Sequence, residues 1–176
     1  MFMKNITLGL DVSTSKIGYS IIDDNKSLIE YGTWKYKTNI QLENRVELLI
    51  EELKTLRNKY DIRRVYVEEP FIAFSGGRTT AVTMAKLQRF NGMCCYGVFH
   101  IFGYCPTLIS ANQARKSVGI QRKKGQDIKK KVIEWVKKEY PKDFIFELTR
   151  YGNPKPGTDD MADAIVVALA GLNLKQ

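Results

Sequence analysis

Short apolar runs separated by turn-forming residues open the chain. Three runs rich in β-branched and aromatic residues cover 6–12, 17–22 and 28–36, and clusters of Ser, Thr, Asp and Asn lie between them. This spacing is typical of strands joined by tight turns. The pattern predicts a meander of three antiparallel strands.

Helical periodicity begins after the meander. From 41 to 60, apolar residues recur every three or four positions, with basic residues late, as the helix dipole favours. We expect a buried strand over 64–68, a long apolar helix over 79–102 and a short strand over 106–109. Ser110 and Gln113 have the spacing of a capping box that starts a short helix. An amphipathic helix is predicted over 126–140, and a last helix over 158–172 with Thr158 as its N-cap.

The composition fits a single globular domain over residues 1–176. The chain is 44% hydrophobic, and its formal net charge of +9 favours a polyanionic partner. Cys94, Cys95 and Cys105 have neither the number nor the spacing of a disulfide framework or a zinc site. No stretch approaches the roughly 18 to 20 apolar residues of a membrane span, and no signal-peptide pattern is present. We therefore expect a cytoplasmic protein without membrane contact, or one of the host cytoplasm if its source is viral.

Acidic residues lie beside apolar runs at three separated places. Asp11 ends the first run, and Glu68 ends the predicted buried strand. Asp160 and Asp163 lie at the head of the last helix. A charge held near a core is costly unless a cation neutralises it. Four such carboxylates in a basic chain favour a divalent-metal site that cuts a polyanion, with DNA as the favoured substrate.

Spacing indicates which carboxylates can act together. Alternation along a strand places Glu68 and Glu69 on opposite faces. Asp160 and Asp163 are three apart on a helix and point the same way, whereas Asp159 is rotated by roughly 100 degrees. Mg²⁺ prefers carboxylate and water oxygens, and two ions about 3.5 to 4 Å apart can activate water and stabilise a leaving oxygen. We expect two Mg²⁺ ions, replaceable by Mn²⁺, and we assign no role to Glu69.

Each acidic position also has an ordinary structural explanation. A lone aspartate after a strand often starts a turn, and acidic residues commonly occupy the first turn of a helix. The joint occurrence of all four, in matching orientation within a basic chain, favours the metal site.

Three segments resemble the RuvC family of Holliday-junction resolvases: GLDVSTSKIGYSII, VYVEEPFIA and DDMADAIVVAL. The resemblance covers nearly the whole chain in order and spacing, and a phage-type member is compatible with it. It implies an α/β, ribonuclease H-like fold, in which helices flank a five-stranded mixed sheet made of the antiparallel meander and parallel strands. It also implies a Mg²⁺-dependent endonuclease that resolves four-way DNA junctions by paired incision. The implied metal ligands are Asp11, Glu68, Asp160 and Asp163.

A basic segment precedes the last helix. The resemblance places Lys116 on a family residue near the scissile phosphate, while the second family lysine aligns with Gly125, next to Lys124. Arg122, Lys123 and Lys124 are expected in a loop before a helix, where they can bind phosphates. A solvated charged surface is the alternative for the lysines that follow.

Two further features concern DNA binding and assembly: an aromatic residue after the buried strand, and the long apolar helix. Phe71 follows Glu68 by three residues, where the family carries an aromatic side chain that inserts among bases, although packing beneath the loop is the alternative. The long helix has more apolar surface than one sheet contact needs, which is consistent with the homodimer of the family. Met84 and Leu87 are taken as outward positions, and His100 as a packed or hydrogen-bonded helix residue rather than a general base.

Other functions stay open. The first run also resembles the phosphate loop of sugar kinases and actin-like ATPases, although those phosphotransferases clamp ATP between two domains and would leave Asp160 and Asp163 without a role. A non-catalytic protein that binds branched DNA is another alternative, and ribonuclease H activity is the nearest one among nucleases. The sequence determines neither a cleavage consensus nor the strictness of junction selectivity, a branch-migration partner or a cellular rather than viral origin.

Overall fold

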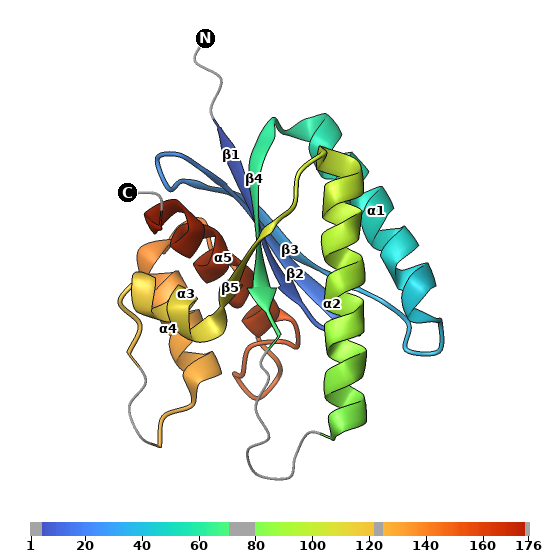
Figure 1. Cartoon of the computed structure of the whole chain (residues 1–176). Helices are drawn as coiled ribbons and strands as arrows, with labels where there is room; N and C mark the ends of the chain where they lie inside the picture. The colour runs from blue at the N-terminus through green and yellow to red at the C-terminus, as the bar shows by residue number, and fades with distance from the viewer. Residues whose placement is uncertain (1–4, 71–79, 122–124, 175–176) are drawn as a thin grey trace.

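A five-stranded mixed sheet organises the computed structural model, which describes residues 5–70, 80–121 and 125–174. The strand order is β3-β2-β1-β4-β5 (Figure 1). Strands β1, β2 and β3 are antiparallel neighbours, whereas β4 runs parallel to β1 and β5 parallel to β4. The strands are β1 (Ile6–Val12), β2 (Lys16–Asp23), β3 (Leu28–Lys35), β4 (Ile62–Glu69) and β5 (Thr107–Ser110).

Helices cover both faces of the sheet. The helices are α1 (Leu42–Lys59), α2 (Ala81–Phe102), α3 (Ala111–Ser117), α4 (Ile128–Glu139) and α5 (Thr158–Asn173). Figure 1 shows α1 and α2 on one side and the other three helices on the opposite side. Within the described ranges, no helix has the length and apolar character needed to cross a membrane. The predicted mixed sheet with flanking helices is confirmed.

Strand alternation builds two hydrophobic cores. Leu8 and Leu10 of β1 and Val67 of β4 belong to the core beneath α1 and α2. Tyr66 of β4 belongs to the other core, with Ile165 of α5. The intervening residues of β1 and β4 therefore face α5, and this is the face on which the candidate site lies.

The predicted elements are present, and the structure corrects their ends. The capping box of Ser110 and Gln113 is confirmed, since both of its hydrogen bonds form. Thr158 as the N-cap of α5 is wrong. Gly157 occupies that position with φ of 106°, a left-handed conformation that suits glycine. The Thr158 hydroxyl instead donates to the carbonyl of Lys155 at 2.8 Å.

Small residues let α5 approach the sheet closely. A Cβ atom at Gly18 of β2 would lie 2.0 Å from the carbonyl oxygen of Asp160, and one at Gly9 would lie 2.3 Å from that of Ala164. The hydroxyl of Ser20 donates to the same Ala164 carbonyl at 2.9 Å. These contacts fix the head of α5 against the first two strands.

This packing predicts opposite effects for two glycine substitutions. Gly18→Ala should lower the free energy of unfolding by about 1 to 3 kcal/mol, because the new methyl meets helix backbone rather than a movable side chain. Gly97→Ala in α2 is the control. Its Cβ would lie 3.4 Å from Ile50, an ordinary contact, and alanine stabilises a helix interior by roughly 0.5 to 1 kcal/mol. Urea unfolding measures both, and a Gly18→Ala protein of unchanged stability would contradict the close approach.

Candidate active site

Parallel pairing brings two acidic residues to one edge of the sheet. Leu10 of β1 is in register with Val67 of β4, so Asp11 and Glu68 follow at neighbouring positions near the carboxyl ends of these strands. Asp11 also pairs with Gly18 of the neighbouring strand β2. The site therefore starts from two carboxylates held on adjacent strands.

The head of α5 supplies the other two carboxylates. Because Gly18 contacts the backbone of Asp160, that residue lies next to Asp11, the cross-strand partner of Gly18. Asp163 follows nearly one helical turn later and shares the Asp160 side of α5. Thus residues from β1, β4 and α5 meet at the same end of the sheet.

The orientation predicted for Glu68 is confirmed. The ring of Tyr66, two residues earlier on the same strand face, packs so closely on α5 that a Cβ at Gly171 would lie 2.2 Å from it. Glu68 therefore points toward α5, and Asp163 on that helix raises its pKa. Glu69 is exposed. Of the two adjacent glutamates, Glu68 is therefore the one on the α5 side of the strand.

The four carboxylates form one interacting cluster. Burial raises the pKa of Asp11 well above its usual range, and the charges of the other three carboxylates raise it further. Burial, followed by the charge of Asp163, raises the pKa of Glu68 to about 7. Burial also raises the pKa of Asp163 to about 6. Charged carboxylates are therefore costly here unless cations accompany them.

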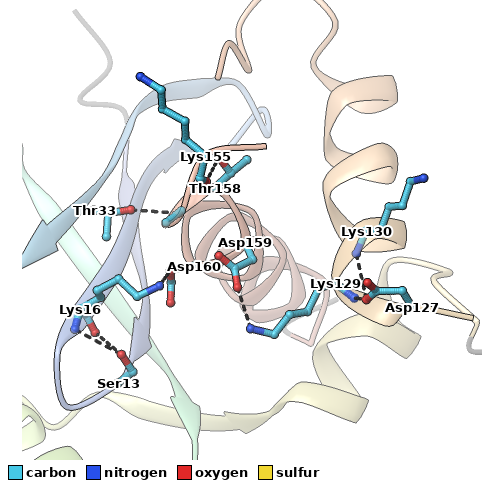
Figure 2. Close-up of polar contacts among 11 residues, drawn as sticks. Ser13, Lys16, Thr33, Asp127, Lys129, Lys130, Lys155, Thr158, Asp159 and Asp160 are labelled. Carbon is cyan, nitrogen blue, oxygen red and sulfur yellow. Dashed lines mark hydrogen bonds and ion pairs between the residues drawn. The ribbon is translucent and has the colours of Figure 1, made fainter. Parts of the chain in front are cut away.

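Two lysines reach the head of α5 from different elements. Figure 2 shows Lys16 of β2 directed at Asp160, with 2.5 Å between Nζ and Oδ2. It also shows Lys129 of α4 directed at Asp159, with 2.6 Å between the corresponding atoms. Asp159 thus lies apart from Asp160, as its rotation on the helix predicts. The contact between Lys16 and Asp160 had one signal in the sequence. Alternation along β2 places Lys16 on the same face as Gly18.

On α3, Arg115 rather than Lys116 acts on the cluster. The positive charge of Arg115 lowers the pKa values of both Glu68 and Asp163. Lys116 is exposed, and both residues line a small cavity that includes Ile120. Consecutive residues on a helix point about 100 degrees apart, so only one of the two can face the carboxylates. Lys116 was the residue predicted on this helix, and Arg115 was not predicted.

Several predicted residues lie outside the described ranges. These are Phe71 in the segment that follows β4, and Arg122, Lys123 and Lys124 in the segment between α3 and α4.

The donor chemistry of the cluster fits a divalent cation. Carboxylate oxygens are the ligands that Mg²⁺ prefers, and a nearby cation lowers the cost of charging groups whose pKa values burial has raised. Among the residues with described positions, no three acidic, histidine or cysteine side chains already converge as a complete ligand set. Within the cluster, Oδ2 of Asp160 is already engaged by the ammonium group of Lys16.

Comparison with known proteins gives the relationship of the chain. No family model matches it. The crossover junction endodeoxyribonuclease RuvC of Dictyoglomus thermophilum is 26% identical over 171 residues, which cover 94% of each chain. RuvC of Fusobacterium nucleatum is 25% identical over 171 residues, which cover 94% of this chain and 79% of the relative. The chain resembles RuvC enzymes along nearly its whole length. The predicted resemblance is confirmed.

Solved resolvases share the fold of this chain. Thermus thermophilus RuvC in complex with a Holliday junction substrate has a TM-score of 0.67 at 15% identity, covering 97% of this chain and 95% of that one. The yeast mitochondrial Holliday junction resolvase has a TM-score of 0.61 at 15% identity, covering 98% and 80%. Fowlpox virus resolvase, with its junction DNA, has a TM-score of 0.55 at 15% identity, covering 97% and 98%. The predicted ribonuclease H-like fold is therefore confirmed.

The raised carboxyl pKa values of this cluster predict that the metal-free protein loses stability as pH rises. Folded Glu68 and Asp163, with pKa values of about 7 and about 6, keep protons that the unfolded chain has released above about pH 4.5. The folded state therefore binds more protons, and its stability falls as pH rises from about 4.5 through about 7. Thermal unfolding in EDTA should show this fall.

Glu68→Gln removes the charged form and should flatten that dependence by on the order of 2 kcal/mol across the interval. The exposed Glu69→Gln variant is the matched control. Identical pH profiles for wild type and Glu68→Gln would contradict the burial of this carboxyl group.

Proposed function

We propose that this protein is a metal-dependent, structure-selective endonuclease that resolves four-way DNA junctions or other branched DNA. The observation that carries the proposal is the meeting of Asp11, Glu68, Asp160 and Asp163 at one end of the sheet. Full-length similarity to proteins named crossover junction endodeoxyribonuclease supports the same reaction.

The chain contributes candidate ligands and cations at one end of the sheet. Strands β1 and β4 hold Asp11 and Glu68, while α5 presents Asp160 and Asp163 near its positive end. When bound, two Mg²⁺ or Mn²⁺ ions would supply Lewis-acid activation of water and stabilise the leaving 3′ oxygen. Arg115, whose charge already acts on the carboxylates, is suited to neutralise charge on the phosphate under attack.

DNA binding is proposed for the side of the site formed by α3 and α4. Lys116 is exposed there, and Arg122, Lys123 and Lys124 connect the two helices in sequence. Phosphate contacts by such residues would position the strand without reading its sequence. Lys116 and Lys124 remain candidates for transition-state contacts.

Base insertion is proposed for Phe71. It follows β4, the strand whose end carries Glu68, so the chain continues from the carboxylates into the segment that holds this aromatic residue. Stacking on a splayed base would hold a junction open at the point of cleavage.

The carboxylates distinguish this proposal from its alternatives. An ATP-dependent phosphotransferase would leave Asp160 and Asp163 without a function, yet α5 is packed so that both face Asp11 and Glu68. A purely DNA-binding protein would not need to concentrate negative charge on its substrate-facing side, because that charge repels phosphates.

The first prediction from this function concerns the four carboxylates. Asp11→Asn, Glu68→Gln, Asp160→Asn and Asp163→Asn should each lower junction cleavage by at least about 100-fold, because each removes a metal ligand. Junction binding should persist in Ca²⁺. Glu69→Gln, exposed on the other strand face, is the control and should stay close to wild type.

Gel assays at matched salt should compare a four-way junction, a fork, a duplex and an RNA/DNA hybrid. Junctions should be cut fastest. Faster cleavage of the hybrid would favour ribonuclease H activity, and an active Glu68→Gln beside an inactive Glu69→Gln would reverse the assignment of the ligand.

A homodimer is proposed through the outer face of α2. Val82, Tyr96 and Phe99 on this helix are 78%, 63% and 47% exposed, an unusual amount of apolar surface for one helix. Met84 as an outward position is wrong, because its side chain is buried on the inner stripe of the helix. Exposed His100 stacks near Tyr96 at a ring distance of 6.1 Å, so it lies on this face. Twofold symmetry would match the two strands cut in a four-way junction.

Sedimentation tests this assembly. Wild type should sediment as a dimer at micromolar concentration, and Tyr96→Glu should yield monomers that nick single strands without pairing the cuts, because charge is costly in an apolar interface. Ile145→Glu, at an exposed apolar residue outside α2, is the matched control and should remain dimeric. A monomeric wild type would exclude the proposed interface.

A further inference from the structure

Lys16 directly contacts one member of the carboxylate cluster. Its ammonium group lies 2.5 Å from Oδ2 of Asp160, a residue 144 positions away in sequence. The Asp160 side chain is only 9% exposed and that of Lys16 is 28% exposed, so solvent screens this pair far less than a surface pair. Figure 2 shows the lysine extending from the start of β2 toward the head of α5.

The backbone directs Lys16 to this place. Lys16, Gly18 and Ser20 alternate along β2 and therefore share the face that packs on α5. Gly18 contacts the Asp160 carbonyl, and Ser20 donates to the Ala164 carbonyl. The turn before β2 is fixed as well, since the hydroxyl of Ser13 donates to the carbonyl of Lys16 at 2.9 Å. Lys16 and Asp160 therefore lie on two elements, β2 and α5, that pack tightly against each other.

The charge on Lys16 is too small to balance the cluster. Four carboxylates face this site, and burial together with mutual repulsion raises the pKa values of Asp11, Glu68 and Asp163. One ammonium can satisfy a single member of the set. A divalent ion would satisfy several of them and would draw on the carboxylate of Asp160, whose Oδ2 atom Lys16 now contacts.

We propose that Lys16 is a positioning residue that holds Asp160 in the metal-free protein and competes with a divalent cation for that carboxylate. The inference rests on the metal site of the proposed function. Ion binding displaces the ammonium group, which then lies beside the cluster as a free donor for a phosphate of the incoming strand. This competition lowers the affinity for metal in the absence of DNA. A phosphate that accepts a hydrogen bond from the displaced ammonium group favours the metal-bound form.

The Lys129–Asp159 pair provides a matched comparison. Lys129 lies at the same end of α5, and its charge also acts on Asp11, Glu68 and Asp163. Its direct partner, however, is Asp159, which is not one of the four carboxylates. Lys129→Met therefore removes a positive charge that acts on the cluster without releasing Asp160.

Calorimetric titration of the DNA-free dimer or monomer with Mn²⁺ alone tests the proposal. Lys16→Met should bind Mn²⁺ about tenfold more tightly than wild type, a coupling of ordinary size between competing ligands. Lys16→Arg, which keeps the charge, should stay near wild type. Lys129→Met should change the affinity by less than about threefold, because its field acts at longer range. Unchanged or weaker Mn²⁺ binding by Lys16→Met, or an equal gain in Lys129→Met, would overturn direct competition.

Thermal unfolding gives a second readout. In EDTA, Lys16→Met should melt a few degrees below wild type, because Asp160 then lies buried without its cation. The gap should close in saturating Mn²⁺, and a deficit that persists there would indicate a merely structural lysine. Junction cleavage by the wild-type protein is measured separately. If the wild type cuts junctions but Lys16→Met binds Mn²⁺ as the wild type does, the role of Lys16 is rejected and the proposed function is not.

Discussion

The close packing of α5 on β1 and β2 is the constraint on which the active-site end of this protein depends. Gly9 and Gly18 leave room for the helix backbone, and any Cβ atom at Gly18 would overlap the carbonyl of Asp160. The hydroxyl of Thr33 on β3 adds a hydrogen bond of 3.1 Å to the Gly157 carbonyl just before the helix. The start of α5 is therefore held by contacts to the backbone of this segment, which do not depend on the charge state of its side chains.

That constraint has an electrostatic consequence. Once the helix is fixed, the carboxylates cannot separate to relieve repulsion, so burial and like charge raise the pKa values of Asp11, Glu68 and Asp163. Cationic side chains from separate elements offset part of this cost: Arg115 and Lys129 lower the pKa values of Glu68 and Asp163, and Lys16 pairs with Asp160. The remaining imbalance is what a divalent cation would relieve. The stability of the site and its proposed capacity to bind metal therefore have the same physical origin.

Local features of the sequence predicted most of the fold. Strands and helices follow from hydrophobic periodicity, and the capping box of Ser110 and Gln113 depends on residues three positions apart. The preference for Glu68 over Glu69 also came from local geometry, because alternation is a property of any strand. The first residue of α5 was less predictable. Thr158 is a good N-cap by composition, but Gly157 takes the position because its backbone adopts a left-handed conformation.

The sequence by itself thus determined which elements form, on which face of each element the carboxylates lie and which family the chain resembles. Only the tertiary structure decided which cations accompany those carboxylates. Lys16 reaches Asp160 across 144 residues, and Arg115 rather than Lys116 acts on Glu68, because these relations depend on how separate elements pack. Periodicity specifies the side of an element that is buried, whereas the partner that covers it is set by the packing of the whole sheet and its helices.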